Sequence, residues 1–334
     1  MNIPSSKYLK IKAKNRLESG KDPQKTVLVF SGIVAGSTFL VNMMQYVVNS
    51  QISQTGGLQN IGLRSMLSTL DSILPLLFQL LLMCVGLGYV AAMLRIARHQ
   101  FASPKTLKAG AERFWVLLRA KLLMGLIYFG IAFALSYAAM GIFMVTPWAN
   151  AFSELVMPMI LDGSFTPELL LSNDALVDSI MAALSPMMMI YVLLLIPAYL
   201  FVSYFYRLTD YFLIDQPRAG ALSAMRQSRQ TLRGNKWSLF KIDLSFWWYY
   251  LLRVVNTTLQ YLLLILAMFG IQLPVSPAVS FFGVMLLYLA AEFAINVLLR
   301  NRVEVTYALV YDTLVPRQIP DSQNGAVLGN IFQM

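Results

Sequence analysis

Two charged side chains lie within apolar stretches near the carboxyl end of the chain. Arg253 follows a run of aromatic and aliphatic residues, and Glu292 lies in the next apolar run. Such a pair of charges is costly to bury unless the two groups contact each other and receive further hydrogen bonds. Asn256, Gln260 and Asn296 lie within one or two helical turns of these charges and can supply those bonds. The set predicts either an ion pair that holds two helices in register or a polar site that lines a path for a substrate or an ion.

Residues that commonly carry catalysis or bind metals are scarce. The chain has one histidine, His99, which excludes His-clustered metal sites, and one cysteine, Cys84, which excludes an intrachain disulfide. The sequence has no G-x-S-x-G, Walker A or H-E-x-x-H motif. Glu292 also lacks the acidic neighbour that a paired-glutamate membrane protease needs. We therefore expect a protein that is not an enzyme and that uses no metal or cofactor.

The composition indicates that lipid covers much of the surface. Of the 334 residues, 57% are hydrophobic and only 13% are charged, and the mean hydropathy is +0.62. A soluble globular protein carries roughly 25% charged residues because its surface faces water. The net charge of +10 fits either nucleic acid or an anionic membrane surface as a partner. The distribution of the basic residues along the chain favours the membrane and excludes nucleic acid.

Six apolar stretches are each long enough to cross the hydrocarbon layer, which takes about 20 helical residues. They predict an all-α fold, a polytopic membrane helix bundle with six transmembrane helices. We expect a basic amphipathic segment at 1–25, a six-span transmembrane domain at 26–316 and a flexible cytoplasmic tail at 317–334. The expected spans are 27–48, 72–94, 122–145, 186–206, 244–269 and 280–299.

Basic residues occur in alternate intervals between these spans. The intervals 1–25, 95–121 and 207–243 contain seven Lys or Arg residues each, and three more follow the sixth span. The other intervals contain only Arg64. Because basic loops stay on the cytoplasmic side, this alternation predicts a multi-pass protein with both termini in the cytoplasm.

Each strongly basic interval contains an amphipathic stretch just before a span. In the third, apolar residues from Leu222 to Leu232 follow one helical stripe and arginines follow another. We interpret the three stretches as cytoplasmic elbow helices at the membrane interface, and the three copies of elbow plus helical hairpin as a degenerate three-fold repeat. The basic side chains expected to face anionic lipid are Lys105, Lys108, Arg113, Arg218, Arg226, Arg229, Arg233 and Lys236.

Arg253 and Glu292 are expected at nearly the same depth in the membrane. At 1.5 Å per residue, Arg253 lies about 15 Å beyond Asp243, and Glu292 lies about 12 Å before Arg300. The fifth and sixth spans form a hairpin, so the two charges approach the same face on adjacent helices and predict an ion pair. In the first span, the Gly32-x-x-x-Gly36 pattern permits close contact with another helix.

Three segments carry a resemblance to a known family. Residues 224–246 combine an amphipathic helix, a basic-Gly-x-basic element and an aromatic Leu-Phe…Leu-Ser-Phe entry into the fifth span. Residues 11–17 and 306–314 add an Ala-basic-Leu helix and a closing Tyr-x-x-Leu stretch. Together they resemble a family of uncharacterised bacterial six-helix integral membrane proteins that is known as a domain of unknown function. The resemblance implies the plasma membrane of a bacterium and implies no catalytic residue.

Two functions fit these features. The preferred interpretation is a non-catalytic membrane scaffold or accessory subunit, with anionic lipid head groups of the cytoplasmic leaflet as partners. A membrane protein partner or a second copy of the chain fits the same interpretation. The alternative is a transporter or channel for a small solute or a lipid, with its polar site at Arg253 and Glu292. A polar cavity that reaches this pair favours transport, whereas a sealed bundle favours binding.

Overall fold

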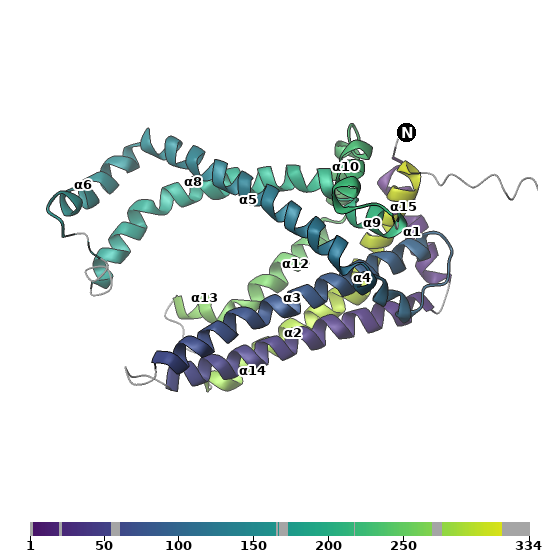
Figure 1. Cartoon of the computed structure of the whole chain (residues 1–334), viewed down its shortest axis with the longest axis horizontal. Helices are drawn as coiled ribbons and strands as arrows, with labels where there is room; N and C mark the ends of the chain where they lie inside the picture. The colour runs from purple at the N-terminus through teal and green to yellow at the C-terminus, as the bar shows by residue number, and fades with distance from the viewer. Residues whose placement is uncertain are drawn as a thin grey trace, which may run out of the picture. The chain divides into compact units, whose positions relative to one another are not determined.

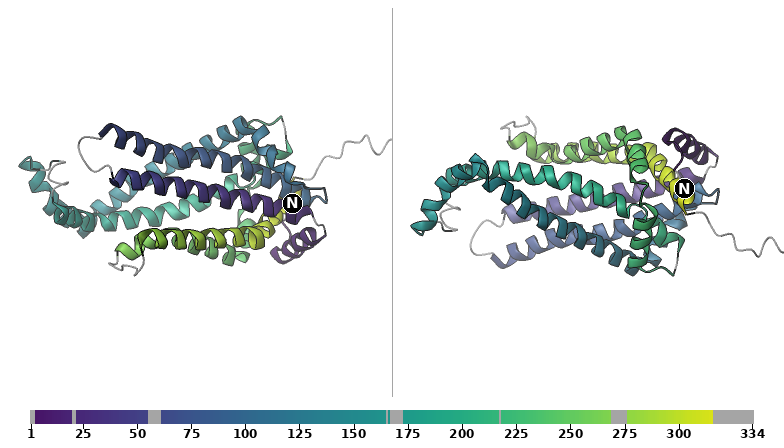
Figure 2. Two further views of the ribbon diagram at one scale, coloured as in Figure 1. Left: turned by 90° about the horizontal axis from the view of Figure 1, so that it is seen from below. Right: turned by 90° about the horizontal axis from the view of Figure 1, so that it is seen from above.

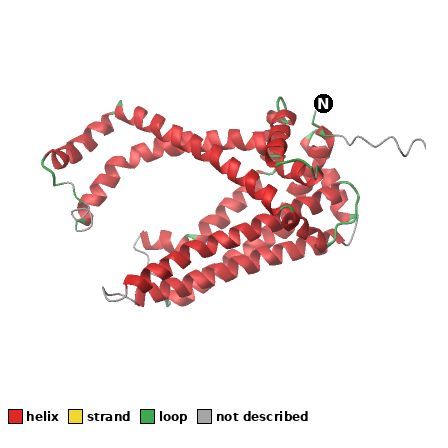
Figure 3. Ribbon diagram, in the orientation of Figure 1, coloured by secondary structure: helices red, strands yellow, loops and turns green. Residues whose placement is uncertain are grey.

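The computed structural model describes residues 3–19, 22–54, 61–164, 166, 173–216, 218–268 and 276–315. Every regular element among these residues is a helix, as the all-α prediction requires (Figure 3). The tail predicted at 317–334 lies outside the described residues. The chain divides into two compact units, one formed by Met1–Leu117 with Leu208–Met334 and the other by Leu118–Arg207.

The first unit contains most of the helices (Figure 1). Several begin at residues typical of helix starts. Ser5 Oγ accepts from the Tyr8 N–H at the first helix, and Ser276 precedes a helix that has Pro277 at its first position. The helices are α1 (Ser6–Glu18), α2 (Asp22–Gln54), α3 (Ile61–Ala97), η2 (Pro104–Lys108), α4 (Ala109–Glu112), α9 (Thr209–Asp215), α10 (Ala221–Thr231), α11 (Lys236–Ser245), α12 (Trp247–Gln260), α13 (Leu262–Met268), α14 (Pro277–Ile295), η3 (Asn296–Arg300) and α15 (Asn301–Leu314).

Three long helices of this unit, α2, α3 and α14, run side by side (Figure 2). Aromatic side chains join them at both ends. Phe30 of α2 stacks on Tyr89 of α3 with ring centroids 4.0 Å apart, and Tyr46 of α2 stacks on Phe281 of α14 at 4.6 Å. The helix α12 packs along α14, and these two helices lie within the segments predicted as the fifth and sixth spans.

The helices α1, η2, α9 and α15 pack with the carboxyl end of α3 into a core that we call the base. Every residue from Val305 to Tyr311 of α15 is buried, so this helix is surrounded on all sides. Leu9 and Ala13 of α1 are buried in the same core, where α1 contacts α15. The base thus resembles the interior of a water-soluble domain, in which apolar side chains are covered by other protein.

Five helical segments in the described part of the chain are long and apolar enough to cross a membrane. Many of their large apolar side chains are uncovered. Leu126 and Phe129 are each 67% exposed, and Leu76 is 60% exposed. Exposed apolar side chains in such number on long helices suit a lipid environment. These helices indicate a membrane protein. The segments are Pro23–Ile52, Ser65–Ala97, Phe114–Met144, Ala175–Asp215 and Ala278–Leu314.

The span predicted at 244–269 does not form one continuous helix. It is divided among α11, α12 and α13, with interruptions at Phe246 and Tyr261. The Tyr261 N–H donates to the Thr258 and Leu259 carbonyls, which tightens the last turn of α12. One turn earlier, the Thr258 hydroxyl donates to the Val254 carbonyl, a side-chain bond that often bends helices.

The elbow stretches are helical, but their apolar faces pack on protein. In α10, Ala224 and Met225 are buried against α9, and Leu232 just beyond the helix is also buried. Only Leu222 of the predicted stripe is exposed, at 70%. Most of the predicted apolar stripe of the third elbow is therefore covered by protein in the base.

The second elbow is held by close backbone contact. It is a 3₁₀ turn, η2, followed by the short helix α4, and both pack on α3. A Cβ added to Gly88 of α3 would lie 2.0 Å from the Leu107 carbonyl oxygen, and one on Gly110 would lie 1.8 Å from the Cys84 carbonyl oxygen. Only glycine permits this approach at both positions.

The second unit contains α6 (Pro147–Leu161), α8 (Asp174–Tyr206) and most of α5 (Phe114–Met144). Tyr199 of α8 donates its hydroxyl to the Tyr128 carbonyl of α5 at 3.2 Å. The helix α8 begins at Asn173, whose side chain accepts from the Leu176 N–H, so it extends well ahead of the span predicted at 186–206.

Candidate functional site

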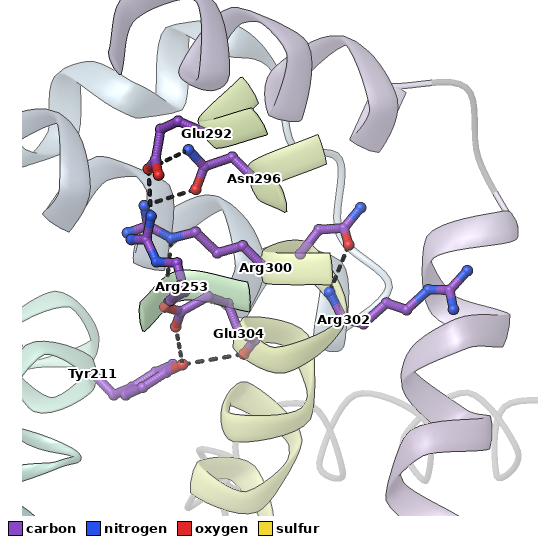
Figure 4. A network of polar contacts seen from close by, with 8 residues as sticks. Tyr211, Arg253, Glu292, Asn296, Arg300, Arg302 and Glu304 are labelled. Atoms are coloured by element: carbon purple, nitrogen blue, oxygen red, sulfur yellow. Dashed lines mark hydrogen bonds and ion pairs between the residues drawn. The ribbon is translucent and has the colours of Figure 1, made fainter. Parts of the chain in front are cut away.

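The carboxylate of Glu292 is the centre of a buried polar cluster. Glu292 lies on α14, is 7% exposed and accepts a hydrogen bond from Arg253 Nη1 on α12. The two side chains that the sequence analysis pairs therefore contact each other (Figure 4). The Arg253 side chain keeps 34% of its surface exposed, whereas the Glu292 side chain keeps 9%. The carboxylate is thus the more deeply buried partner.

Two amides complete the contacts of this carboxylate. Asn256 Nδ2 donates to Glu292 Oε2 at 3.0 Å, and Asn296 Nδ2 donates to Oε1 at 2.9 Å. Both asparagines are buried, at 3% and 1% exposure. Asn256 reaches the carboxylate because it lies one helical turn after Arg253, on the same face of α12. Charge-assisted hydrogen bonds of this kind are stronger than neutral ones and hold the carboxylate in one orientation.

The helix changes its winding one turn after Glu292. Residues Asn296–Arg300 form a π-helical turn, η3, between α14 and α15. Such turns are rare and occur frequently at functional sites. Here the turn carries Asn296 at its start and Arg300 at its end, so both ends of η3 contribute to the polar cluster.

The cluster continues along the helix to the base (Figure 4). Arg300 Nη1 donates to Asn296 Oδ1 at 3.3 Å, and Arg300 Nε lies 3.9 Å from Glu304 Oε1. The Tyr211 hydroxyl of α9 donates to Glu304 Oε2 at 3.3 Å. The sequence analysis missed these three residues, although Glu292, Asn296, Arg300 and Glu304 recur every four residues, which is the spacing of one helical face.

Gln260 is the predicted site residue that does not join Glu292. It lines a separate cavity of about 40 Å³ together with Asn42 of α2 and Tyr288 of α14. A cavity of this size holds about one water molecule. Gln260 lies one turn beyond Asn256, and Tyr288 lies one turn before Glu292, so the cavity adjoins the cluster along both helices.

The chemistry of the Glu292 cluster is that of charge stabilisation. Arg253 supplies the opposite charge to the Glu292 carboxylate, and two amides supply hydrogen bonds to it. Asn256 Oδ1 is buried and has no hydrogen-bond partner among the described residues, which is an arrangement that native structures seldom leave unexplained. Within the described part of the chain, no three His, Cys, Asp or Glu side chains are placed to hold a metal ion.

A second buried cluster lies in the base and was not foreseen from the sequence. Arg98, just after α3, forms a bidentate pair with Asp215 of α9 at 2.5 and 3.1 Å, and its Nε donates to Asp312 of α15 at 2.7 Å. Burial lowers the pKa of Arg98, but hydrogen bonds and charge from the two aspartates outweigh it and raise the pKa above its ordinary value. The cluster joins three helices through one permanently charged guanidinium.

The predicted lipid-facing basic residues differ in exposure. Arg113 is half-buried and donates to the Leu213 and Gln216 carbonyls, so it holds the base together. Lys236 is also partly covered. The other six side chains are exposed: Lys105, Lys108, Arg218, Arg226, Arg229 and Arg233.

Exposed aromatic side chains accompany the third basic elbow. Trp237 is 65% exposed and stacks on Phe240 with ring centroids 5.1 Å apart. The Lys241 ammonium lies 5.9 Å from the Trp237 ring centre, within cation–π range. Trp and Tyr side chains concentrate where hydrocarbon meets water, so this elbow has the composition of a membrane interface.

Known proteins identify the chain only at the level of its family. No curated protein and no solved structure matches the chain. Residues 1–315 match a family described as "Protein of unknown function (DUF975)", which covers the base, the long apolar helices and the Glu292 cluster. The chain therefore belongs to this family of unknown function.

Proposed function

We propose that this chain is a non-catalytic integral membrane protein that binds anionic lipid head groups on the cytoplasmic leaflet. The surface that binds them is formed by Leu222, Arg226, Arg229, Arg233, Lys236, Trp237, Phe240 and Lys241, and we call it the α10–α11 surface. One observation carries the proposal. The third elbow buries its small apolar face on α9 and directs arginines, Leu222 and Trp237 outward from the same short stretch.

Electrostatics gives this surface its affinity for an anionic leaflet. Each Lys or Arg close to such a leaflet contributes about 1 kcal/mol, and the attraction weakens with salt. Leu222 and Trp237 add apolar area that a purely aqueous surface would not favour. The combination distinguishes a lipid-binding surface from a basic loop that merely determines topology.

The proposal includes six spans with both termini in the cytoplasm of a bacterium. Five segments have the length of spans, and α12 with α13 supports a sixth. Residues 247–268 would extend about 33 Å as one bent helix, which is enough to cross the hydrocarbon layer. The basic intervals support the orientation, because all Lys and Arg residues in the intervals between spans and at the termini, except Arg64, lie in the intervals predicted to be cytoplasmic.

The three-fold repeat is supported by the order of elements in the chain. A basic elbow precedes a hairpin of long helices at α1–α2–α3, and another precedes the pair α12–α14. The second elbow, η2–α4, precedes α5 in the same way. In all three copies the elbow contains buried apolar residues, as expected of one ancestral unit adapted to different neighbours.

The test is the lipid content of protein purified without detergent in polymer-bounded native membrane discs. We expect the wild type to be enriched in anionic phospholipid relative to the surrounding membrane. The triple variant R226Q/R229Q/R233Q should lose most of this enrichment. The control is K7Q/K12Q/K14Q, which removes the same charge from α1; an equal loss in both variants would show only a general charge effect.

The same preparation distinguishes a lipid-binding protein from an accessory subunit. Mass spectrometry of the discs would detect a second protein at a fixed ratio to this chain. Such a partner, bound equally by the wild type and the α10 triple variant, would contradict lipid binding as the main role of the α10–α11 surface. A second copy of the chain would appear as a doubled mass.

A transporter or channel is the second candidate function. It is supported by the unpaired Asn256 Oδ1 and by the small cavity in which Asn42, Gln260 and Tyr288 are the polar lining residues. Cys84 is the chain's one cysteine, so a C84S background allows single cysteines to be placed at 42 and 260. Labelling by a membrane-impermeant thiol reagent from one side would favour a solvent path, whereas protection from both sides favours the binding protein.

A further inference from the structure

A pocket in the base lies between the end of α1, the start of α2 and the turn after α3. Its volume is about 350 Å³, which falls in the range of small-molecule sites. The polar residues that line it are Arg16, Ser19, His99 and Gln100, and Ile96 and Phe101 form part of its apolar wall. None of the lining residues that the structure describes is acidic.

One nitrogen of the Arg16 guanidinium lacks a partner among the described residues. This Nη1 atom is buried and has no hydrogen-bond acceptor there. A buried charged donor without an acceptor is costly, so such groups usually belong to a ligand site or an ion pair. Among the acids whose side chains the structure describes, Glu18 lies 3.8 Å from Lys14, and Asp215 and Asp312 bind Arg98. The Arg16 Nη1 atom is therefore a buried donor to which no described acid is paired.

His99 occupies a backbone position that favours glycine. Its φ angle is +57°, and the turn is closed by a hydrogen bond from the Gln100 N–H to the Arg95 carbonyl at 2.8 Å. Helices often end in this left-handed turn, and glycine is the usual residue there because a side chain is strained. The chain instead has its one histidine at this position, and that side chain lines the pocket beside Arg16.

The first turn of α2 also borders the pocket. Pro23 lines it, and α2 is a helix of 33 residues. Pro23 has no N–H, so the polar donors that border this space come from Arg16, Ser19, His99 and Gln100.

We propose that Arg16, His99 and Gln100 bind a phosphoryl oxyanion in this pocket. The planar fork of arginine matches the geometry of phosphate oxygens and can donate two parallel hydrogen bonds. The phosphoryl group belongs either to the head group of an anionic phospholipid or to free phosphate. The apolar wall at Ile96 and Phe101 and the adjacent membrane helix favour the lipid. Binding of a lipid head group in this pocket would extend the proposed function and rests on it. Binding of an oxyanion as such does not rest on the proposed function.

The pocket can be tested on the full-length protein in detergent, with thermal unfolding as the readout. Sodium phosphate should raise the unfolding midpoint above that in sodium chloride of equal ionic strength. R16Q should need about tenfold or more phosphate for the same shift, because a charge-assisted bond contributes about 1.5–3 kcal/mol. The matched control is K14Q, which removes one charge from α1 outside the pocket and should respond as the wild type does.

The variant H99G separates binding from structure. Glycine adopts the left-handed turn without strain, so H99G should unfold at a higher temperature than the wild type in the absence of phosphate. Its response to phosphate should nevertheless be weaker. A purely structural histidine would instead lower the midpoint when removed and leave the phosphate response unchanged, and that result would overturn the proposal.

Lipid discs then identify the source of the phosphoryl group. Discs of phosphatidylcholine with and without phosphatidic acid are compared by native mass spectrometry for lipid bound to wild type, R16Q and K14Q. Loss of bound phosphatidic acid in R16Q alone assigns a lipid head group, and a phosphate response without lipid retention assigns a soluble anion. If R16Q and H99G match the wild type in both assays, the pocket is not an anion site. The α10–α11 surface would then still be judged by its own triple variant.

Discussion

The Glu292 cluster and the Arg98 cluster use buried charge in opposite ways. Glu292 is one carboxylate served by Arg253 and two neutral amides, all from a pair of adjacent helices. Arg98 is one guanidinium shared by two aspartates from helices far apart in the sequence. The first therefore joins two neighbouring helices, whereas the second joins three helices of the base. The difference shows that the buried carboxylate draws its partners from its own helical stretch and the helix beside it, whereas the guanidinium draws its partners from distant parts of the chain.

Exchanging the charges should have the largest effect and should separate the two clusters. R253E and E292R each place like charges together in apolar surroundings, and each should abolish or severely reduce folded protein. The double variant R253E/E292R restores opposite charges and should recover part of the folded fraction. The measurement is the monodisperse yield after solubilisation in a mild detergent. Single variants that match the wild type would show that the Arg253–Glu292 contact contributes nothing.

Replacement of Arg98 should lower the free energy of unfolding somewhat less than the charge reversals do. One further substitution should not restore the stability in full. R98M leaves two partly buried aspartates without their cation, a loss expected to be about 3 kcal/mol. Because Arg98 serves two acids, D215N or D312N added to R98M should restore only part of the stability. Unfolding in a denaturing detergent, followed by trypsin sensitivity of the base, measures this loss. Full rescue by either single substitution would contradict the shared arrangement.

Filling the close contact between α3 and the second elbow should have an intermediate effect on stability. G88A forces a methyl group against the Leu107 carbonyl oxygen, and such overpacking typically costs about 1–3 kcal/mol. The matched control is G86A on the same helix, because a Cβ there meets no described atom within 4 Å. Thermal unfolding should separate the two variants by several degrees. Equal midpoints would mean that the elbow is not tightly packed.

Replacement of Gln260 should have the smallest effect on stability. It is therefore useful for distinguishing a lipid-binding protein from a transporter. Q260M keeps the length of the side chain and should change the free energy of unfolding by about 0.5 kcal/mol or less. A binding protein should then retain its anionic lipid, whereas a solute path through the Gln260 cavity should lose transport in reconstituted vesicles. A large loss of stability in Q260M would show that Gln260 belongs to the Glu292 cluster.

The sequence predicts the Glu292 cluster well and the Arg98 cluster not at all, for a physical reason. Arg253 and Glu292 stand out because their surroundings are apolar, and helical spacing gives their depth. Arg98 lies in a basic interval and meets aspartates 117 and 214 residues away. Charges in polar segments are common, and nothing local indicates which of them will meet in the folded chain.

The close contacts of glycines and the breaks in helices are likewise difficult to predict from the sequence. The Gly32-x-x-x-Gly36 pattern suggested close contact, but a Cβ at either position meets nothing within 4 Å among the described residues. Gly88 and Gly110, which do permit close contact, form no recognisable pattern because they lie on different helices. The interruption at Tyr261 likewise lies beside a bond from the Thr258 hydroxyl to the backbone, and hydropathy does not record such bonds.

The most direct test of the central claim is the lipid environment of Trp237. A variant that keeps this tryptophan and has phenylalanine at the other four positions is reconstituted into vesicles with brominated lipid, which quenches nearby tryptophan fluorescence. We predict stronger quenching by brominated anionic phospholipid than by brominated phosphatidylcholine, with the difference lost when R226Q/R229Q/R233Q is added. Equal quenching by the two lipids, unchanged by the triple substitution, would contradict the α10–α11 surface as an anionic lipid site.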